Sequence, residues 1–279
     1  MFLAQLKNEL LKLFGKKRTY IGFGAFLLAQ TVMLLMFKYS RWQKDFHNLL
    51  EGNGYLATDY ISALTVSLVM LWPQFMLLMP LYVTLVGGDL VAKEAEDGTL
   101  RMILSRPISR FRLLLVKWLA GAIFAAALVI VLGFFALAFA RCCFPWSGMF
   151  VFAHFPFTFS IFSASEGLGL YVYSQLFMTL HAITLLSLAF MFSCFNMKPA
   201  AATILALSFL FMSMVIEQIP FFERYQDWFL SHHLESWFLM YQKPQPWAQI
   251  MQSEVILLAV SASALIIGAM GFQIRDIKS

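Results

Sequence analysis

The chain has 279 residues, of which 61% are hydrophobic and only 13% are charged. Since a water-soluble domain carries about 25% charged residues, this composition excludes an ordinary soluble enzyme and indicates a protein surrounded by lipid. The net charge of +5 does not predict a nucleic-acid-binding protein, because the basic residues are spread along the chain instead of being grouped in one soluble module.

Residues 1–18 form an amphipathic segment. Leucines recur at helical spacing from Leu3 to Leu13, and lysines occupy the other faces of the predicted helix. This pattern predicts a helix that lies in the membrane interface. Two roles fit it equally well: an anchor against anionic headgroups, or a lever that joins a cytoplasmic partner to the first span.

Six apolar stretches are long enough to cross a bilayer, since about 20 helical residues span the hydrocarbon layer. They cover residues 19–37, 61–86, 113–139, 168–195, 200–219 and 255–272. Fourteen of the 20 Lys and Arg residues lie on alternate connecting segments and at the chain ends, and basic residues favour the cytoplasmic side. We therefore predict an all-α, multi-pass membrane protein with six spans and both termini in the cytoplasm.

The longer segments on the predicted outer side differ in character. Residues 140–167 are rich in aromatic side chains, and we expect them to lie in the outer interface or to dip partly into it. Residues 220–253 are predicted to form an extracytoplasmic helical segment. Ser253 and Glu254 then supply a cap and a favourable acid at the start of the sixth span.

The sequence predicts no metal site. His232, His233 and Glu235 lie close together, but adjacent histidines on a helix point about 100° apart and cannot easily share one ion. Packing in the interface is the better interpretation of this group. The three cysteines show no metal-ligand spacing either.

Few polar residues lie within the predicted spans. Gln74, Gln175 and His181 are the candidates to line a transport pathway, because intramembrane polar side chains usually face a bundle interior or a cavity. Hydrogen bonds between helices, with no role in transport, are the more frequent alternative. No chain of acids suitable for coupling to ions or protons is evident. Pro73 and Pro80 should kink the second span.

Residues 88–112, between the second and third spans, form the most informative segment. The Asp-Gly pair at 97–98 should end one helix, because glycine tolerates the left-handed conformation found at helix ends. Thr99 can cap a second short helix, Pro107 ends it, and Ser109 can cap the third span. We predict a short capped helix across the cytoplasmic mouth of the bundle.

This segment carries the pattern E-x-x-x-G-T-L-x-x-x-L-S-x-P-I-S-R-x-x-x-L-x-x-K, from Glu94 to Lys117. The pattern closely resembles the signature loop of the ABC type-2 transporter permeases. The amphipathic start and the six-span plan extend the resemblance over nearly the whole chain. It implies the permease half of an ATP-driven exporter in a prokaryotic plasma (inner) membrane, with the short loop helix as the coupling helix.

The resemblance also implies partners. Two permease halves, identical or related, would meet side by side in the lipid, and each would sit on a separate ATPase subunit that holds ATP and Mg²⁺. By matching motif positions, the surface that docks on the ATPase or holds the docking helix in place is assigned to Glu94, Gly98, Thr99, Leu100, Arg101 and Arg110.

No cofactor site and no enzymatic activity are expected in this chain. It lacks the phosphate-binding string G-x-x-x-x-G-K-[ST] and the hydrolase motifs H-E-x-x-H and G-x-S-x-G. Two other functions remain open at this point. One is a membrane scaffold that assembles other proteins without transport, and the other is a secondary transporter or channel that works without ATP.

Overall fold

The computed structural model of the chain describes residues 2–105, 108–153 and 158–274. The elements, in chain order, are α1 (Phe2–Gly15), α2 (Lys17–Tyr39), α3 (Arg41–Gly52), α4 (Ala57–Tyr60), α5 (Ala63–Pro73), η1 (Gln74–Leu78), α6 (Met79–Glu96), α7 (Thr99–Leu104), α8 (Arg110–Cys143), β1 (Met149–Ala153), β2 (Thr158–Phe162), α9 (Ala164–Cys194), α10 (Pro199–Glu217), η2 (Pro220–Trp228), α11 (Leu230–Leu234), α12 (Ser236–Leu239) and α13 (Trp247–Ile274).

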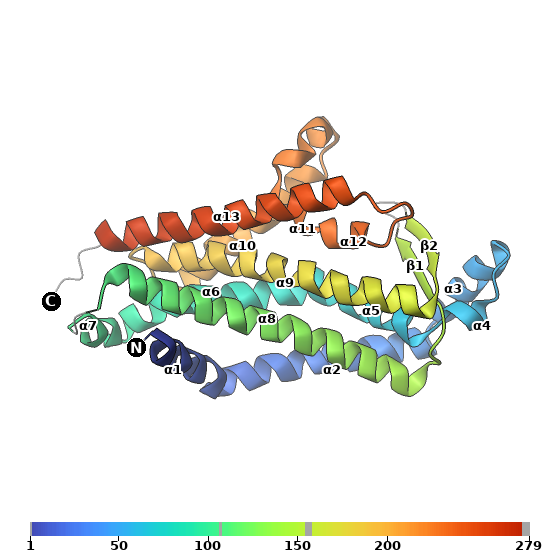
Figure 1. Cartoon of the computed structure of the whole chain (residues 1–279), viewed down its shortest axis with the longest axis horizontal. Coiled ribbons are helices and arrows are strands. Elements are labelled where there is room, and N and C mark those ends of the chain that lie inside the picture. The colour runs from blue at the N-terminus through green and yellow to red at the C-terminus, as the bar shows by residue number, and fades with distance from the viewer. Residues whose placement is uncertain (1, 106–107, 154–157, 275–279) are drawn as a thin grey trace.

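The long helices form one elongated bundle (Figure 1). Helix α1, helix α7 and the last turns of α13 lie at the same end, which we call the N/C end. The strands β1 and β2 and the helices α3 and α4 lie at the opposite end, which we call the hairpin end.

Among the described residues, six helical segments are long and apolar enough to cross a membrane. They are Lys17–Tyr39, Ala63–Glu96, Arg110–Cys143, Ala164–Cys194, Pro199–Glu217 and Trp247–Ile274. Each contains most of one predicted stretch, and several extend well beyond it, because a helix ends at its cap and not at the hydrocarbon boundary. The Ser109 hydroxyl accepts a hydrogen bond from the Arg112 N–H, so the predicted cap of the third span is confirmed.

The second span is made of α5, η1 and α6 in continuous sequence. The five residues of η1 form a π-helical turn, in which the Met79 N–H bonds to the Gln74 carbonyl five residues back. Pro80 has no N–H and its ring crowds the carbonyl four residues earlier, so a wider turn relieves the clash. The irregularity expected from Pro73 and Pro80 therefore takes the form of a π-turn.

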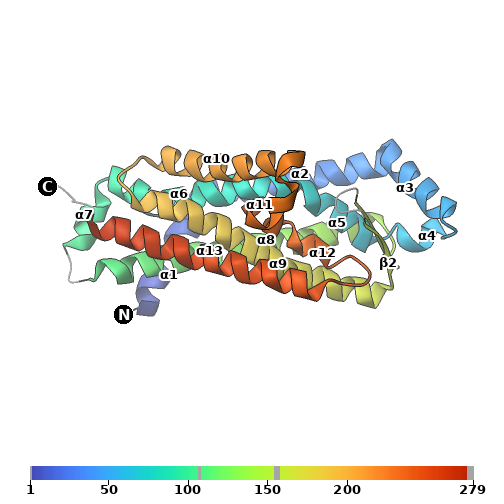
Figure 2. The same cartoon turned by 90° about the horizontal axis from the view of Figure 1, so that it is seen from above.

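Helix α9 is the central helix and packs along α6, α8, α10 and α13 (Figure 2). Its contact with α6 is close because Gly87 has no side chain. A Cβ atom at Gly87 would lie 2.6 Å from the Leu186 carbonyl oxygen and 3.0 Å from the Ala189 Cβ. Small residues allow such backbone approach between membrane helices.

The described part of residues 140–167 contains two paired strands, and its place in the outer interface stays a prediction. Helix α8 continues to Cys143, and the chain then forms an antiparallel hairpin in which Met149 pairs with Phe162. The Phe150 N–H donates to the Thr65 hydroxyl at 2.9 Å, which fixes the hairpin on α5. The bundle is all-α as predicted, and this two-stranded sheet is an addition to it.

The expected cap at Ser253 and Glu254 is wrong. Helix α13 begins at Trp247, so both residues lie inside it, and the Ile250 N–H already bonds to the Pro246 carbonyl. The first turns of α13 are polar, and for that reason they looked like a connecting segment in the sequence. Before α13, the predicted helical segment consists of three short helices, η2, α11 and α12.

We expect Gly87→Ala to destabilise the fold by about 1–3 kcal/mol, because the new methyl group would meet a backbone oxygen that cannot rotate away. Gly24→Ala is the matched control, since a Cβ at Gly24 has nothing within 4 Å. Thermal unfolding of the detergent-solubilised protein measures the difference. Equal midpoints for the two variants would contradict close packing between α6 and α9.

Candidate functional site

A buried lysine joins three helices at the N/C end. The side chain of Lys117, on α8, is only 1% exposed. Its Nζ lies 3.0 Å from Glu9 Oε2 on α1 and 2.7 Å from Glu94 Oε1 on α6. A single buried charge costs several kcal/mol, so this lysine depends on its two carboxylate partners.

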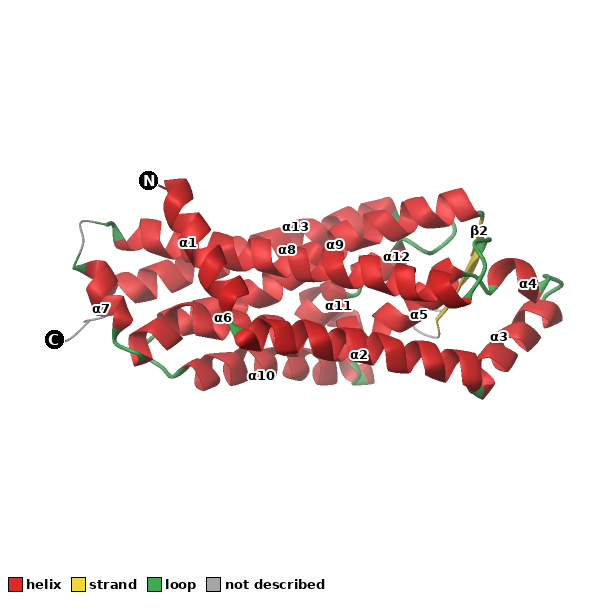
Figure 3. Cartoon of the chain, turned by 90° about the horizontal axis from the view of Figure 1, so that it is seen from below, coloured by secondary structure: helices red, strands yellow, loops and turns green. Residues whose placement is uncertain are grey.

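A second lysine completes the group. Lys12 Nζ, also on α1, lies 2.8 Å from Glu9 Oε1 and 3.2 Å from Glu94 Oε1. We call Glu9, Lys12, Glu94 and Lys117 the N/C charge cluster. Because its four members come from α1, α6 and α8, the cluster binds the amphipathic helix to the bundle. Figure 3 shows α1 crossing the bundle obliquely before α2 runs along it.

The start of α2 is also tied to α6. Arg18 forms an ion pair with Asp89, and the Tyr82 hydroxyl donates to the Thr19 carbonyl at 3.2 Å. The Thr19 hydroxyl in turn donates to the Leu13 carbonyl at 2.6 Å, which closes the end of α1. The junction between α1 and α2 is therefore held on α6 by side-chain contacts.

The loop between the second and third spans has the predicted helix break. Gly98 has φ +73°, which is the left-handed region, and it separates α6 from α7. Thr99 is not the N-cap of α7, because it is already the first residue of that helix. Its hydroxyl donates a hydrogen bond to the Glu94 carbonyl at 3.3 Å. Leu100 is buried in the main hydrophobic core.

Arg110 also makes internal contacts. Its Nη1 donates to the Phe272 carbonyl at 3.3 Å and to the Gln273 carbonyl at 3.1 Å. These carbonyls belong to the last turn of α13, where no helical N–H is available to them. The remaining residue of the predicted set, Arg101, lies on α7, and its side chain is outside the part of the structure that is described.

The predicted contact residues therefore divide into two groups. Glu94, Leu100 and Arg110 hold the loop against other parts of the chain. The surface near α7 instead exposes apolar side chains that the sequence analysis did not single out, Met102 at 67% and Phe111 at 49%. The exposure of Met102 could have been anticipated only by knowing which face of α7 Leu100 buries.

The three candidate pathway residues lie apart from one another. Gln74 is buried, and its Oε1 lies 3.5 Å from Gln30 Nε2, which also donates to the Leu132 carbonyl. Gln175 packs against Gly133. A Cβ atom at position 133 would lie 2.4 Å from the Oε1 atom of Gln175. Neither side chain contacts the third candidate.

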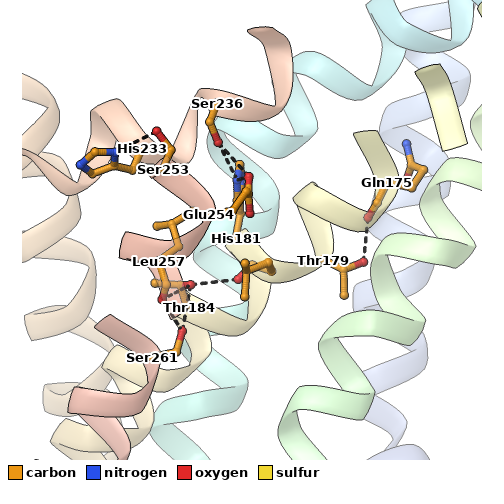
Figure 4. Close-up of polar contacts among 11 residues, drawn as sticks. Gln175, Thr179, His181, Thr184, His233, Ser236, Ser253, Glu254, Leu257 and Ser261 are labelled. Atoms are coloured by element: carbon orange, nitrogen blue, oxygen red, sulfur yellow. Dashed lines mark hydrogen bonds and ion pairs between the residues drawn. The ribbon is translucent and has the colours of Figure 1, made fainter. Parts of the chain in front are cut away.

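His181 is the centre of a buried polar group between α9, α12 and α13 (Figure 4). Its Nε2 lies 3.2 Å from Glu254 Oε1 and 3.3 Å from the Ser236 hydroxyl. Sequence reasoning missed Glu254 as an intramembrane acid because it placed that residue outside the sixth span. A second polar contact between α9 and α13 joins Thr184 to Ser261 at 3.0 Å.

The fold defines a multi-pass membrane protein, and comparison with known proteins gives its family. Residues 6–277 match the family model described as ABC-2 family transporter protein. The chain thus belongs to the ABC-2 transporter family and is a permease of that family, whose members generally work with a separate ATP-binding subunit.

The chain is also similar to the uncharacterized protein YhcI of Bacillus subtilis (strain 168). The two are 27% identical over 86 residues, which is 31% of this chain and 25% of that protein. The similarity therefore spans a quarter of the relative's length.

We expect Lys117→Met to destabilise the protein by about 3–5 kcal/mol, because the substitution keeps the length of the side chain but leaves two acids without their buried partner. Lys44→Met, at an exposed lysine on α3, should leave stability unchanged. Denaturant unfolding of both variants in the same detergent provides the test. A Lys117→Met protein as stable as the wild type would show that the cluster contributes nothing.

The contribution of Glu9 should depend on pH. Burial favours its neutral form, but the Lys117 charge and the hydrogen bonds from Lys12 and Lys117 outweigh burial and hold the pKa of Glu9 below 4.5. A lowered folded-state pKa gives stability that is present above the unfolded value and is lost as the pH falls through the folded value. The difference in unfolding midpoint between wild type and Glu9→Gln should shrink below pH 4.5. A difference that stays constant down to pH 3 would contradict this pairing.

Proposed function

We propose that this chain is the permease subunit of an ABC exporter, driven by a separate ATPase subunit through the segment 88–112. The observation that carries the proposal is the position of α7 at the N/C end, the same end as α1 and the last turns of α13 (Figure 1). A short helix on the surface of a membrane bundle is a suitable contact for a soluble motor, because it lies outside the lipid and is joined to two long spans.

The contacts around α7 support the transmission of force. Leu100 anchors α7 in the core, and Glu94 lies at the end of α6 within the N/C charge cluster. Arg110 begins α8 and bonds to the end of α13. A displacement of α7 would therefore act on α6, α8 and α13 together, and through the cluster on α1. Of the two roles open for α1, these contacts favour the lever.

The exposed surface supports a docking role. Met102 and Phe111 expose apolar side chains beside the charged residues of the loop, and such side chains are frequent anchors in protein interfaces. We assign contact with the ATPase to Met102 and to Arg101, and we assign the positioning of α7 to Glu94, Leu100 and Arg110. Gly98 and Thr99 would shape the turn that presents α7.

The same proposal sets the orientation and the assembly. The N/C end carries Lys12, Arg18, Lys93 and Lys117, and basic residues favour the cytoplasmic side, so both termini would lie in the cytoplasm of a prokaryotic cell. The ATPase would hold ATP and Mg²⁺. A second permease, identical or related, would complete the pathway, with Gln74, Gln175 and His181 as candidate lining residues.

Replacing Met102 by Glu should weaken binding of the ATPase subunit by about tenfold or more, because a charge would replace an apolar anchor. The measurements are co-purification of the two subunits and stimulated ATP hydrolysis in the reconstituted complex. Leu56→Glu is the matched control, since Leu56 is 68% exposed but lies at the hairpin end. If Met102→Glu assembles and stimulates hydrolysis like the wild type, α7 is not the docking helix.

A further inference from the structure

The described part of the chain holds a carboxylate and an imidazole deep in the bundle. The Glu254 side chain is 6% exposed and the His181 side chain 2% exposed, and both lie within membrane-spanning helices. Ionisable side chains at such positions are rare and costly, and they mark functional sites by default. The Ser236 hydroxyl donates to Glu254 Oε1 at 2.9 Å, while Glu254 Oε2 has no hydrogen-bond partner among the described residues.

The surroundings of this pair disfavour an unpaired charge. A bare Glu254 carboxylate beside a neutral imidazole would leave a net negative charge in the bundle interior, which is strongly unfavourable. One proton shared by His181 and Glu254 removes that net charge, whichever of the two atoms carries it. Any proton taken up here needs a route by which it exchanges with water.

A small cavity provides the first step of that route. It has a volume of ≈ 30 Å³ and is lined by His181, Ser231 and Glu235 among apolar side chains of α6, α9 and α10. A water molecule needs about 10–15 Å³ of such space and two to four polar partners. The cavity is large enough for a water molecule, and His181, Ser231 and Glu235 are the polar residues that line it.

The groups beyond Glu235 become gradually more exposed. His232 Nδ1 lies 3.2 Å from Glu217 Oε1, and its Nε2 lies 3.9 Å from Asp227 Oδ1. The side chains of Glu217, His232 and Asp227 are 14%, 25% and 78% exposed. This order leads from the buried pair to the water-exposed η2. The neighbouring His233 is engaged elsewhere, with the Ser253 hydroxyl and the Asp227 carbonyl.

The acid-base properties of the outer groups agree with this geometry. Burial is the main cause that raises the pKa of Glu235 to about 7, and the negative charge of Glu217 adds to it. His232 has a smaller effect in the opposite direction. The hydrogen bond to Glu217 raises the pKa of His232 despite its partial burial. Glu235 can thus change protonation near neutral pH, as a route for proton exchange requires.

We propose that His181, Glu254 and Glu235 form a proton-binding site in the middle of the bundle, and that the site exchanges its proton with water at η2 and α11 through the cavity and His232. The site lies away from the loop 88–112 and does not depend on the proposed coupling to an ATPase. Since Ser236 on α12 bonds to Glu254, the protonation state also affects the contact that holds α12 on α9 and α13.

Infrared difference spectroscopy of the full chain in lipid nanodiscs, recorded between pH 9 and pH 5, tests the site. We expect a protonated-carboxyl band that appears near pH 7 and is absent in Glu235→Gln. Glu235→Asp should restore the band, which separates loss of the acid from misfolding. Glu223→Gln, at an exposed acid on η2, is the matched control and should retain it.

His181 supplies the second part of the test. His181→Gln should move the pH at which the Glu235 band appears, because both residues line the same cavity and the substitution changes the surroundings of Glu235. If the band is missing in the wild type, or persists in Glu235→Gln, the site is wrong. If the band is unchanged in His181→Gln, Glu235 titrates alone and the shared site is overturned.

Discussion

The ammonium group of Lys117 is the charge on which the N/C end depends. It lies between carboxylates from α1 and α6, and removing it would leave Glu9 and Glu94 with only the half-exposed Lys12. Apolar contacts also hold α1, since Leu13 is buried in the main core and Leu6 and Phe14 pack against it. Paired charges also favour one register of α1 on the bundle, because any sliding would separate buried ions. The amphipathic helix is therefore an integral part of the bundle.

The bundle solves the problem of buried charge in two ways. At the N/C end, lysine ammonium groups neutralise glutamates. In the interior, an imidazole is the partner of Glu254, and an imidazole is charged only if it is protonated. The first arrangement is suited to a fixed connection, the second to one that responds to its surroundings. Force transmission and proton binding would thus be separated along the length of one molecule.

Hydropathy predicted the six spans because only long apolar helices can cross a bilayer, and the Ser109 cap was readable from local chemistry. The hairpin could not be predicted in this way. All five residues of β1 are apolar, so the alternation of polar and apolar residues typical of a strand is absent there. Glu254 was misplaced because the polar first turns of α13 resemble a loop, and its partner His181 lies 73 positions away. The sequence motif located Glu94 and Arg110. Their internal partners, Lys12 and Lys117 for Glu94 and the carbonyls of residues 272–273 for Arg110, are set by the tertiary fold.

The unequal lengths of the helices have a geometric consequence. The 19 residues of α10 measure about 28 Å, close to the thickness of the hydrocarbon layer, whereas the 34 residues of α8 measure about 51 Å. Helix α10 starts near the N/C end and stops well short of the hairpin end (Figure 2). A bilayer matched to α10 would leave the rest of α8, the sheet, α3 and α4 outside the membrane as an extramembrane domain. Cys142 and Cys143, which are both exposed, would lie on that domain and away from the acyl chains.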